Sequence, residues 1–170
     1  LTFSQAYIEN CVAHYPQITR RLVKLFAARL HPSAFDDAAA ANLQAELKDQ
    51  LNDVANLDED RILNGFLQVI LATRRTNFWQ KDAQGALKSY VSFKLESNAI
   101  PFLPQPRPMF EIWVYSPRVE GVHLRGSKVA RGGLRWSDRE EDFRTEVLGL
   151  VKAQQVKNSV IVPVGAKGGF

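Results

Sequence analysis

The chain has 170 residues and a formal net charge of +4, with 45% hydrophobic and 24% charged residues, as expected for a globular protein of one or two small domains. The apolar runs 69–72 and 160–164 are far shorter than the roughly 20 residues that cross a bilayer, and no signal-peptide pattern opens the sequence. Cys11 is the single cysteine, which excludes an internal disulfide and a cysteine-rich zinc site, so a reducing, cytoplasmic setting is expected.

The first third of the chain is predicted to be helical. Ser4 is placed to cap a helix through residues 7–15, and Pro16 suits the first position of a second helix over 16–30 because its missing N–H is not needed there. Apolar residues recur at helical spacing along both segments, which indicates two amphipathic helices.

Two further helices follow. An alanine-rich run predicts a third helix over 38–54, and Asp58 is interpreted as the cap of a fourth helix over 58–75. The apolar positions expected on the inner face of the fourth helix are Ile62, Phe66, Val69 and Ile70. The sequence therefore predicts a helical segment over 1–76.

Beyond this segment the apolar pattern changes from helical spacing to alternation. Residues 90–96 alternate apolar and polar side chains, which predicts a half-buried strand. The stretch 99–108 holds four of the eight prolines and is interpreted as a stiff irregular connector, because proline fixes its own backbone torsion. A strand-rich α/β portion, truncated at its C-terminal end, is expected over 77–170.

Two more strands are predicted after the connector. The first covers 110–117, with Phe110, Ile112 and Val114 on one side, and the second covers 119–126. A glycine-containing turn follows over 128–136.

The last part of the chain predicts a helix followed by a buried strand. Ser137 and Glu140 have the spacing of a capping box, so a helix is expected from there to about residue 158. Residues 160–164 form a continuous β-branched run, typical of a strand covered on both faces. The predicted fold class is α/β (mixed α+β), with the helical N-terminal part packed with a mixed sheet.

Three basic residues stand in positions that suit an anionic ligand: Arg131, Lys157 and Lys167. Gly132 and Gly133 follow Arg131, and Lys167 lies within a Gly-Ala-Lys-Gly-Gly segment, where the absence of Cβ atoms lets the backbone approach a ligand closely. A lysine held there, partly desolvated and near other cations, is expected to have a lowered pKa and to act as a general base. The alternative interpretation gives these residues no ligand. Lys167 would then be a solvated loop lysine, Lys157 a favourable cation at a helix end, and Arg131 a turn residue at the surface.

Taken together, residues 128–170 strongly resemble the large, NAD-specific class of glutamate dehydrogenase. The shared features are the basic residue before Gly-Gly-Leu-Arg, the Lys-Asn pair closing a helix, and the Gly-Ala-Lys-Gly-Gly segment. Residues 58–78 and 106–126 also resemble that class. The sequence begins without a methionine, since Met109 is its single one, and we expect an internal piece of a longer enzyme that covers part of the substrate-binding domain.

The resemblance implies roles for six residues. Lys167 is expected to be the catalytic lysine, which polarises the substrate and takes part in proton transfer. The residues expected to bind substrate are Arg131, Lys157, Gly132, Gly133 and Gly168. Smaller relatives usually carry lysine where this chain has Arg131, and the spacing from Lys157 to Lys167 is about two residues shorter than theirs, so an ungapped match would select Gln155 instead of Lys157.

The resemblance also implies an activity. The parent enzyme is expected to convert L-glutamate to 2-oxoglutarate and ammonium with NAD, which a domain absent from this chain would bind. The family's catalytic aspartate also lies beyond Phe170, so we expect the 170-residue chain to be inactive by itself. The full-length enzyme is expected to be a homo-oligomer, with no metal site in this chain and no nucleic-acid or membrane partner.

Two other functions are compatible with parts of the sequence. Basic residues recur in the second half near Phe110, Trp113, Tyr115 and Trp136, a composition seen in nucleic-acid-binding modules. A non-catalytic structural or regulatory segment of the same enzyme is the second alternative, and it is the preferred interpretation of the helical N-terminal third.

Overall fold

The structure is a computed structural model that describes residues 3–126, 135–139, 142–157 and 168–169, with backbone alone for 154–157. Arg131, Gly132, Gly133 and Lys167 lie outside the described residues. The chain divides into two compact units, Leu1–Leu71 and Ala72–Phe170.

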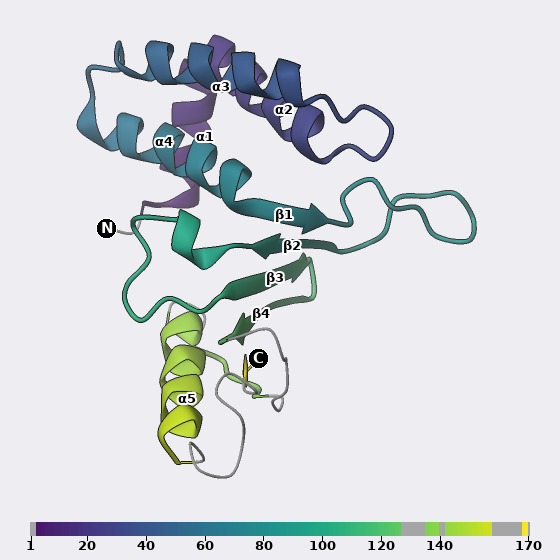
Figure 1. Cartoon of the computed structure of the whole chain (residues 1–170), viewed down its shortest axis with the longest axis vertical. Helices are drawn as coiled ribbons and strands as arrows, with labels where there is room; N and C mark the ends of the chain where they lie inside the picture. The colour runs from purple at the N-terminus through teal and green to yellow at the C-terminus, as the bar shows by residue number, and fades with distance from the viewer. Residues whose placement is uncertain (1–2, 127–134, 140–141, 158–167, 170) are drawn as a thin grey trace. The chain divides into compact units, whose positions relative to one another are not determined.

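The described part of the first unit is helical. Its helices are α1 (Gln5–His14), α2 (Pro16–Leu30), α3 (Asp37–Leu51) and α4 (Leu57–Ala72), the last of which ends at the unit boundary (Figure 1). The Ser4 hydroxyl accepts a hydrogen bond from the Tyr7 N–H at 3.3 Å, and Pro16 occupies the first position of α2. The predicted cap and the predicted helix start are therefore confirmed.

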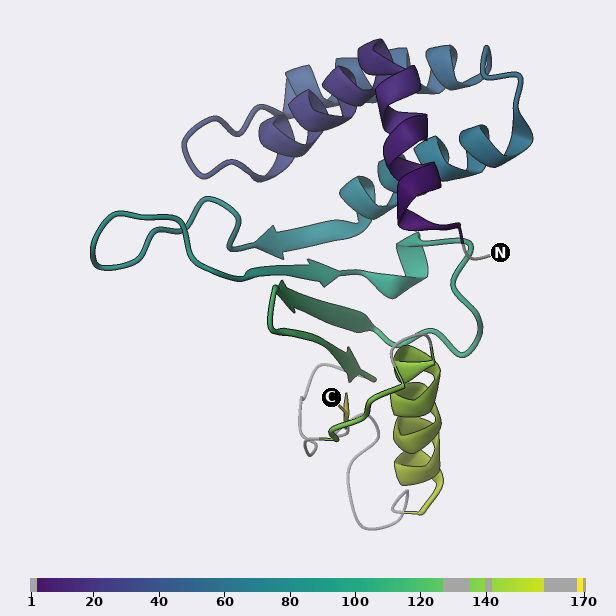
Figure 2. The ribbon, with the colours of Figure 1, turned by 180° about the vertical axis from the view of Figure 1, so that it is seen from behind.

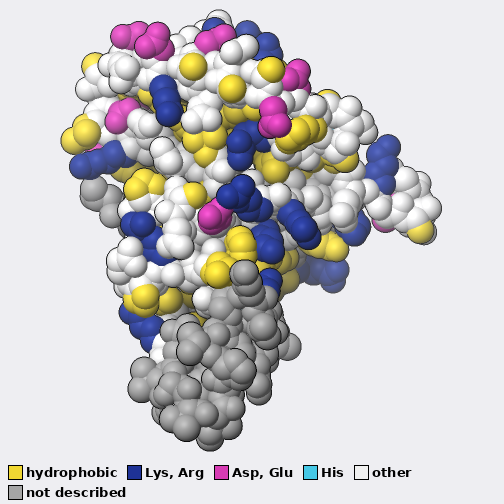
Figure 3. Space-filling view, in the orientation of Figure 1, with side chains coloured by type: hydrophobic (Ala, Val, Ile, Leu, Met, Phe, Trp, Pro, Cys, Tyr) yellow, Lys and Arg dark blue, Asp and Glu magenta, His cyan; other side chains and the backbone are white. Residues whose placement is uncertain are grey.

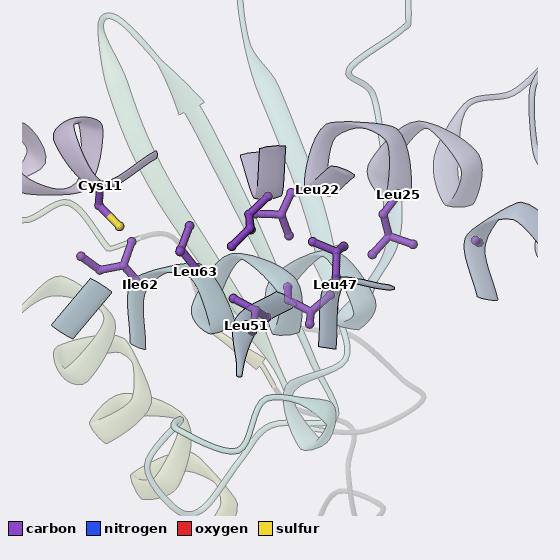
Figure 4. Close-up of a cluster of buried hydrophobic side chains, with 10 residues drawn as sticks. Cys11, Leu22, Leu25, Leu47, Leu51, Ile62 and Leu63 are labelled. Atoms are coloured by element: carbon purple, nitrogen blue, oxygen red, sulfur yellow. The ribbon is translucent and has the colours of Figure 1, made fainter. Parts of the chain in front are cut away.

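The core of this unit is a cluster of leucines between the helices (Figure 4). Leu25, Leu47 and Leu63 are fully buried, and Cys11 lies in the same cluster with 2% of its surface exposed. Burial, followed by the charge of Glu59, raises the pKa of the Cys11 thiol. Less thiolate is available at a raised pKa, so Cys11 serves as a small core residue.

Two predictions about the cap and the inner face of α4 were wrong, whereas Ile62 is buried as predicted. Asn56 is its cap, since the Asn56 Oδ1 accepts from the N–H groups of Asp58 and Glu59 at 2.9 and 3.2 Å. Phe66, expected inside, is 41% exposed. The buried positions of this helix are Ile62, Leu63, Leu67 and Ala72.

The end of α4 also differs from the prediction. The helix stops at Ala72, and residues 73–76 form a strand that belongs with the second unit. Thr73 pairs with Leu95 across the sheet, and the Ala72 carbonyl accepts from the Glu96 N–H at 2.9 Å. Pairing with another part of the chain therefore overrides the helical pattern, as tertiary context commonly does.

The second unit contains an antiparallel sheet. Its strands are β1 (Thr73–Thr76), β2 (Val91–Leu95), β3 (Phe110–Ser116), β4 (Val119–Arg125) and β5 (Gly168–Gly169), paired in that order. Strands β1 to β4 lie side by side in both views (Figures 1 and 2). The strands predicted from residues 90–126 are confirmed, and a short 3-10 helix (Ser97–Ala99) precedes the proline-rich connector. Every described strand pair is antiparallel, and the strand predicted over 160–164 lies outside the described residues.

Helix α5 (Phe143–Lys157) begins later than predicted. Among the described residues, the bond from the Glu146 N–H to the Asp142 carbonyl at 2.9 Å belongs to its first turn. Ser137 lies six residues before Phe143, so it is not the cap of α5: its oxygen accepts from the Arg139 N–H at 3.1 Å, and its hydroxyl donates to the Glu146 carboxylate at 3.1 Å. The helix start predicted at Ser137 is therefore wrong, whereas the Glu140 half of the predicted capping box lies outside the described residues.

One face of α5 packs on β4. The cluster that joins the two elements is apolar and consists of Val122, Leu124, Val147, Leu148 and Val151. Removing these side chains from water stabilises the contact by roughly 1.5–3 kcal/mol for each fully buried residue. The contact has no preferred direction, because hydrophobic burial depends on area rather than on orientation.

A buried ion pair fixes the orientation of α5 on the sheet. The Glu111 carboxylate in β3 accepts from two nitrogens of the Arg144 guanidinium in α5, with Nε at 2.8 Å from Oε2 and the second bond to Oε1. The Glu111 side chain is 6% exposed and that of Arg144 26%. A two-pronged arginine–carboxylate pair fixes both distance and orientation, so it sets the position of α5 on the sheet.

We predict that Arg144→Met destabilises the second unit by about 3 kcal/mol, because it leaves the Glu111 charge buried without its partner. The double variant Glu111→Leu/Arg144→Met should lie within about 1 kcal/mol of wild type, since it removes both charges. The measurement is urea unfolding followed by tryptophan fluorescence, which reports the second unit because Trp79, Trp113 and Trp136 all belong to it.

The control is Glu96→Gln, which breaks the exposed pair between Glu96 and Arg74 in the same unit and should cost less than about 1 kcal/mol. Equal losses from Arg144→Met and Glu96→Gln would contradict the assigned role of the buried pair.

Candidate functional site

Strand β4 is where the described parts of the predicted site meet. Arg125 of β4 pairs with Gly168 of β5, and Leu124 pairs with Gly169. Leu124 also belongs to the apolar cluster under α5. Both α5 and the glycines that follow Lys167 in the sequence are thus held by the last residues of one strand.

The predicted substrate residue Lys157 is the last residue of α5, and Gln155 lies two positions before it. The structure describes their backbone but not their side chains, so the choice between them stays a prediction. Gly168 is described in β5, next to Arg125. The structure therefore brings Gly168 and the helix that carries Lys157 to the same strand.

A second carboxylate ties α5 to the segment that follows Gly133 in the sequence. The Glu146 carboxylate accepts from Arg135 Nε at 2.8 Å and from the Ser137 hydroxyl at 3.1 Å. The hydrogen bond from Arg135 is the largest cause of a lowered Glu146 pKa, and the bond from Ser137 and the charge of Arg139 act in the same direction. Glu146 therefore stays ionised below the usual carboxyl range and holds both partners at neutral pH.

Sequence reasoning did not find Glu146, Glu111 or Arg144. Their roles depend on contacts between residues 9 to 33 positions apart, which no local pattern encodes. The available signal for Arg144 was its place in a helix that also carries the apolar residues Phe143 and Val147.

One face of the sheet is basic. Lys94 lies 4.3 Å from the centre of the Phe110 ring, and the Arg125 guanidinium lies 6.0 Å from the same ring. Burial, followed by the charges of Arg125 and Arg75, lowers the pKa of Lys94. In a space-filling view several Lys and Arg side chains gather near the centre, with an acidic side chain among them (Figure 3). Three cations thus lie close enough to influence one another.

The stacked aromatic residues lie on the opposite face. Trp113 stacks with Phe93 and Tyr115, with ring centroids 5.9 and 5.7 Å apart. Phe93 and Lys94 are neighbours in β2, so their side chains point to opposite sides of the sheet. Single-stranded nucleic acids need cations and stacking rings on one surface. The basic face carries the ring of Phe110, which Lys94 already covers, and the three stacked rings lie on the other face, so this arrangement does not favour the nucleic-acid alternative.

Among the residues that the structure describes, no group of His, Cys, Asp and Glu side chains has the arrangement of a metal site. Within the same residues, no helix combines the length and apolar character needed to cross a membrane.

His123 is predicted to make the second unit sensitive to pH. Burial, followed by the charge of Arg125, lowers the pKa of His123 below its usual value of 6.5. The unfolded chain binds a proton that the folded protein does not, so stability should fall as the pH drops below 6.5 and level off below the folded pKa. Urea unfolding between pH 7.5 and 5.5 should show this loss in wild type and a smaller one in His123→Phe. Identical losses in both proteins would contradict the assignment.

Comparison with protein-family models gives two matches. Residues 46–170 match the model described as bacterial NAD-glutamate dehydrogenase, catalytic domain. Residues 1–32 match the model described as glutamate dehydrogenase, helical motif 3. The first match spans α5, the whole described sheet and every predicted site residue.

Individual relatives agree with the family match. NAD-specific glutamate dehydrogenases from Pseudomonas aeruginosa, Halomonas elongata and Mycobacterium tuberculosis are 59%, 53% and 51% identical to this chain, over 98–100% of its length. The chain spans only 10–11% of the length of these relatives. With a catalytic-domain match over 46–170, the chain belongs to the bacterial NAD-glutamate dehydrogenase family.

Proposed function

We propose that this chain supplies substrate-binding groups and the catalytic lysine of an NAD-dependent glutamate dehydrogenase. The observation that carries the proposal is the catalytic-domain match over 46–170, which includes Arg131, Lys157 and Lys167. The reaction is the oxidative deamination of L-glutamate to 2-oxoglutarate and ammonium. In this proposal the second unit, which holds 77–170 and strand β1, is part of the substrate-binding domain, and the helical first unit precedes it in the sequence.

The proposed roles follow from the two negative charges of glutamate. Arg131 and Lys157 hold carboxylates, and a guanidinium can do so with two parallel bonds. Gly132, Gly133 and Gly168 allow close approach of the backbone. Fixing both carboxylates orients the α-carbon before reaction and removes much of the entropic barrier.

Lys167 is proposed to act on the amino group. In its neutral form it accepts the proton that the substrate amine loses, and in its charged form it polarises the carbonyl of 2-oxoglutarate in the reverse direction. Positive charge close to a lysine favours its neutral form, which is the form that accepts a proton.

The described residues offer no site for NAD. Dinucleotides bind where a parallel strand, a glycine-rich loop and a helix meet, whereas the described sheet is antiparallel in every pair. We therefore assign NAD, which supplies the hydride acceptor, to a part of the polypeptide other than the described residues.

The same proposal includes a cytoplasmic location and a homo-oligomeric enzyme. Its main competitor is a structural role, in which the three basic residues stabilise an interface and take no part in the reaction. Neither this alternative nor a nucleic-acid-binding module is favoured by the family match.

Lys167→Ala in the full-length enzyme is predicted to lower kcat by on the order of 10²–10⁴, the usual contribution of a general acid–base group. The measurement is glutamate-dependent formation of NADH at saturating substrate. The matched control is Lys152→Ala, which removes an exposed lysine of α5 and should leave kcat unchanged. Full activity of Lys167→Ala would favour the interface role.

The 170-residue chain alone is predicted to give no glutamate-dependent NADH, because it spans only 10–11% of the length of the dehydrogenases that it matches. Full-length enzyme at equal molar concentration is the positive control. Sustained turnover by the isolated chain would refute this division of roles.

A further inference from the structure

One row of paired residues crosses the sheet from β2 to β5. It consists of Leu95, Glu111, Leu124 and Gly169, each paired with the next in antiparallel register. Paired residues share a face, so the row belongs to the face that α5 covers at Leu124. Glu111 is the charged member of the row, and it is 4% exposed.

The row places the buried ion pair close to the predicted catalytic segment. Neighbouring strands are about 4.8 Å apart, so Glu111 lies roughly 10 Å across the sheet from Gly169. Arg144 reaches Glu111 from α5 with two hydrogen bonds. The same side chains therefore define where α5 lies relative to the strand that follows Lys167 in the sequence.

A small tilt of α5 at Arg144 becomes a larger displacement at Lys157, because the two residues are far apart along the helix. Arg144 precedes Lys157 by 13 residues, which corresponds to about 20 Å of helix at a rise of 1.5 Å per residue. A tilt of about 5° at Arg144 would displace the end of such a helix by roughly 2 Å. Shifts of about 1 Å in substrate-positioning groups can lower rates substantially.

The apolar contact alone does not prevent such a tilt. Valine and leucine side chains can slide over one another with little change in buried area, because burial carries no directional term. The planar guanidinium loses one or both of its bonds when it tilts. Arg144 and Glu146 lie about 200° apart around the helix, so Glu146 restrains α5 from another side through Arg135 and Ser137.

We propose that Glu111 is a positioning residue for glutamate binding and that it acts through Arg144. The pair sets the separation between the last turn of α5 and the β4–β5 edge, and thus the position of Lys157, which holds a substrate carboxylate in the proposed function, relative to Gly168. This inference rests on the proposed function, and it adds two residues that need not touch the substrate.

The test uses the full-length enzyme with Arg144→Lys, which keeps the charge but loses the two-pronged geometry. The KM for glutamate should rise about five- to tenfold, with kcat within about threefold and the KM for NAD unchanged. The double variant Glu111→Gln/Arg144→Lys should raise the KM no further than the larger single effect, since both substitutions break one interaction. If Glu111→Gln does not fold, Arg144→Lys alone decides.

The matched control is Glu96→Gln, which breaks an Arg–Glu pair at the β1–β2 side of the same sheet. It should leave the KM for glutamate unchanged. A normal KM for glutamate in Arg144→Lys, or an equal rise of that KM in Glu96→Gln, overturns this inference. The proposed function is unaffected by either result as long as the wild-type enzyme turns over glutamate. Absence of glutamate turnover in wild type overturns the proposed function, and this inference with it.

Discussion

The buried ion pair between Glu111 and Arg144 is the constraint on which the second unit depends. Strand β4 provides an apolar surface for α5, but that surface permits many arrangements of similar energy. A carboxylate with 6% of its surface exposed requires a partner in one particular place. The pair therefore contributes a defined geometry more than net stability, as buried ion pairs do when they specify a unique arrangement.

Much of the fold could be predicted from the sequence because the signals were local. The Ser4 cap, the start of α2 at Pro16 and the alternating strand β2 each depend on neighbouring residues. The predictions failed where a distant partner decided the outcome. Residues 73–76 leave the helical pattern because β2 pairs with them, and α5 begins at Phe143, while Ser137 before it donates to Glu146 nine residues away.

The candidate site could be predicted only in part, and the resemblance to a family carried most of it. Glycine and lysine spacing alone left Lys167 open to a solvated-loop interpretation. The sequence pattern of β3 did not indicate that Glu111 is buried. Phe110 and Ile112 suggested that their face of the strand is the inner one, so Glu111, on the opposite face, was expected to be exposed. That face is the one covered by α5 at Leu124, so the buried carboxylate could be recognised only once its partner helix was placed.

Strand β4 contacts two parts of the predicted site: the helix that ends at Lys157 and the glycines that follow Lys167 in the sequence. The most direct test of this account is an experimental structure of the full-length enzyme with glutamate or 2-oxoglutarate bound. The account predicts that Lys167 and at least one of Arg131 and Lys157 contact the same ligand molecule beside β4. A ligand held elsewhere, with Arg131 and Lys167 on opposite sides of the folded chain, would contradict it.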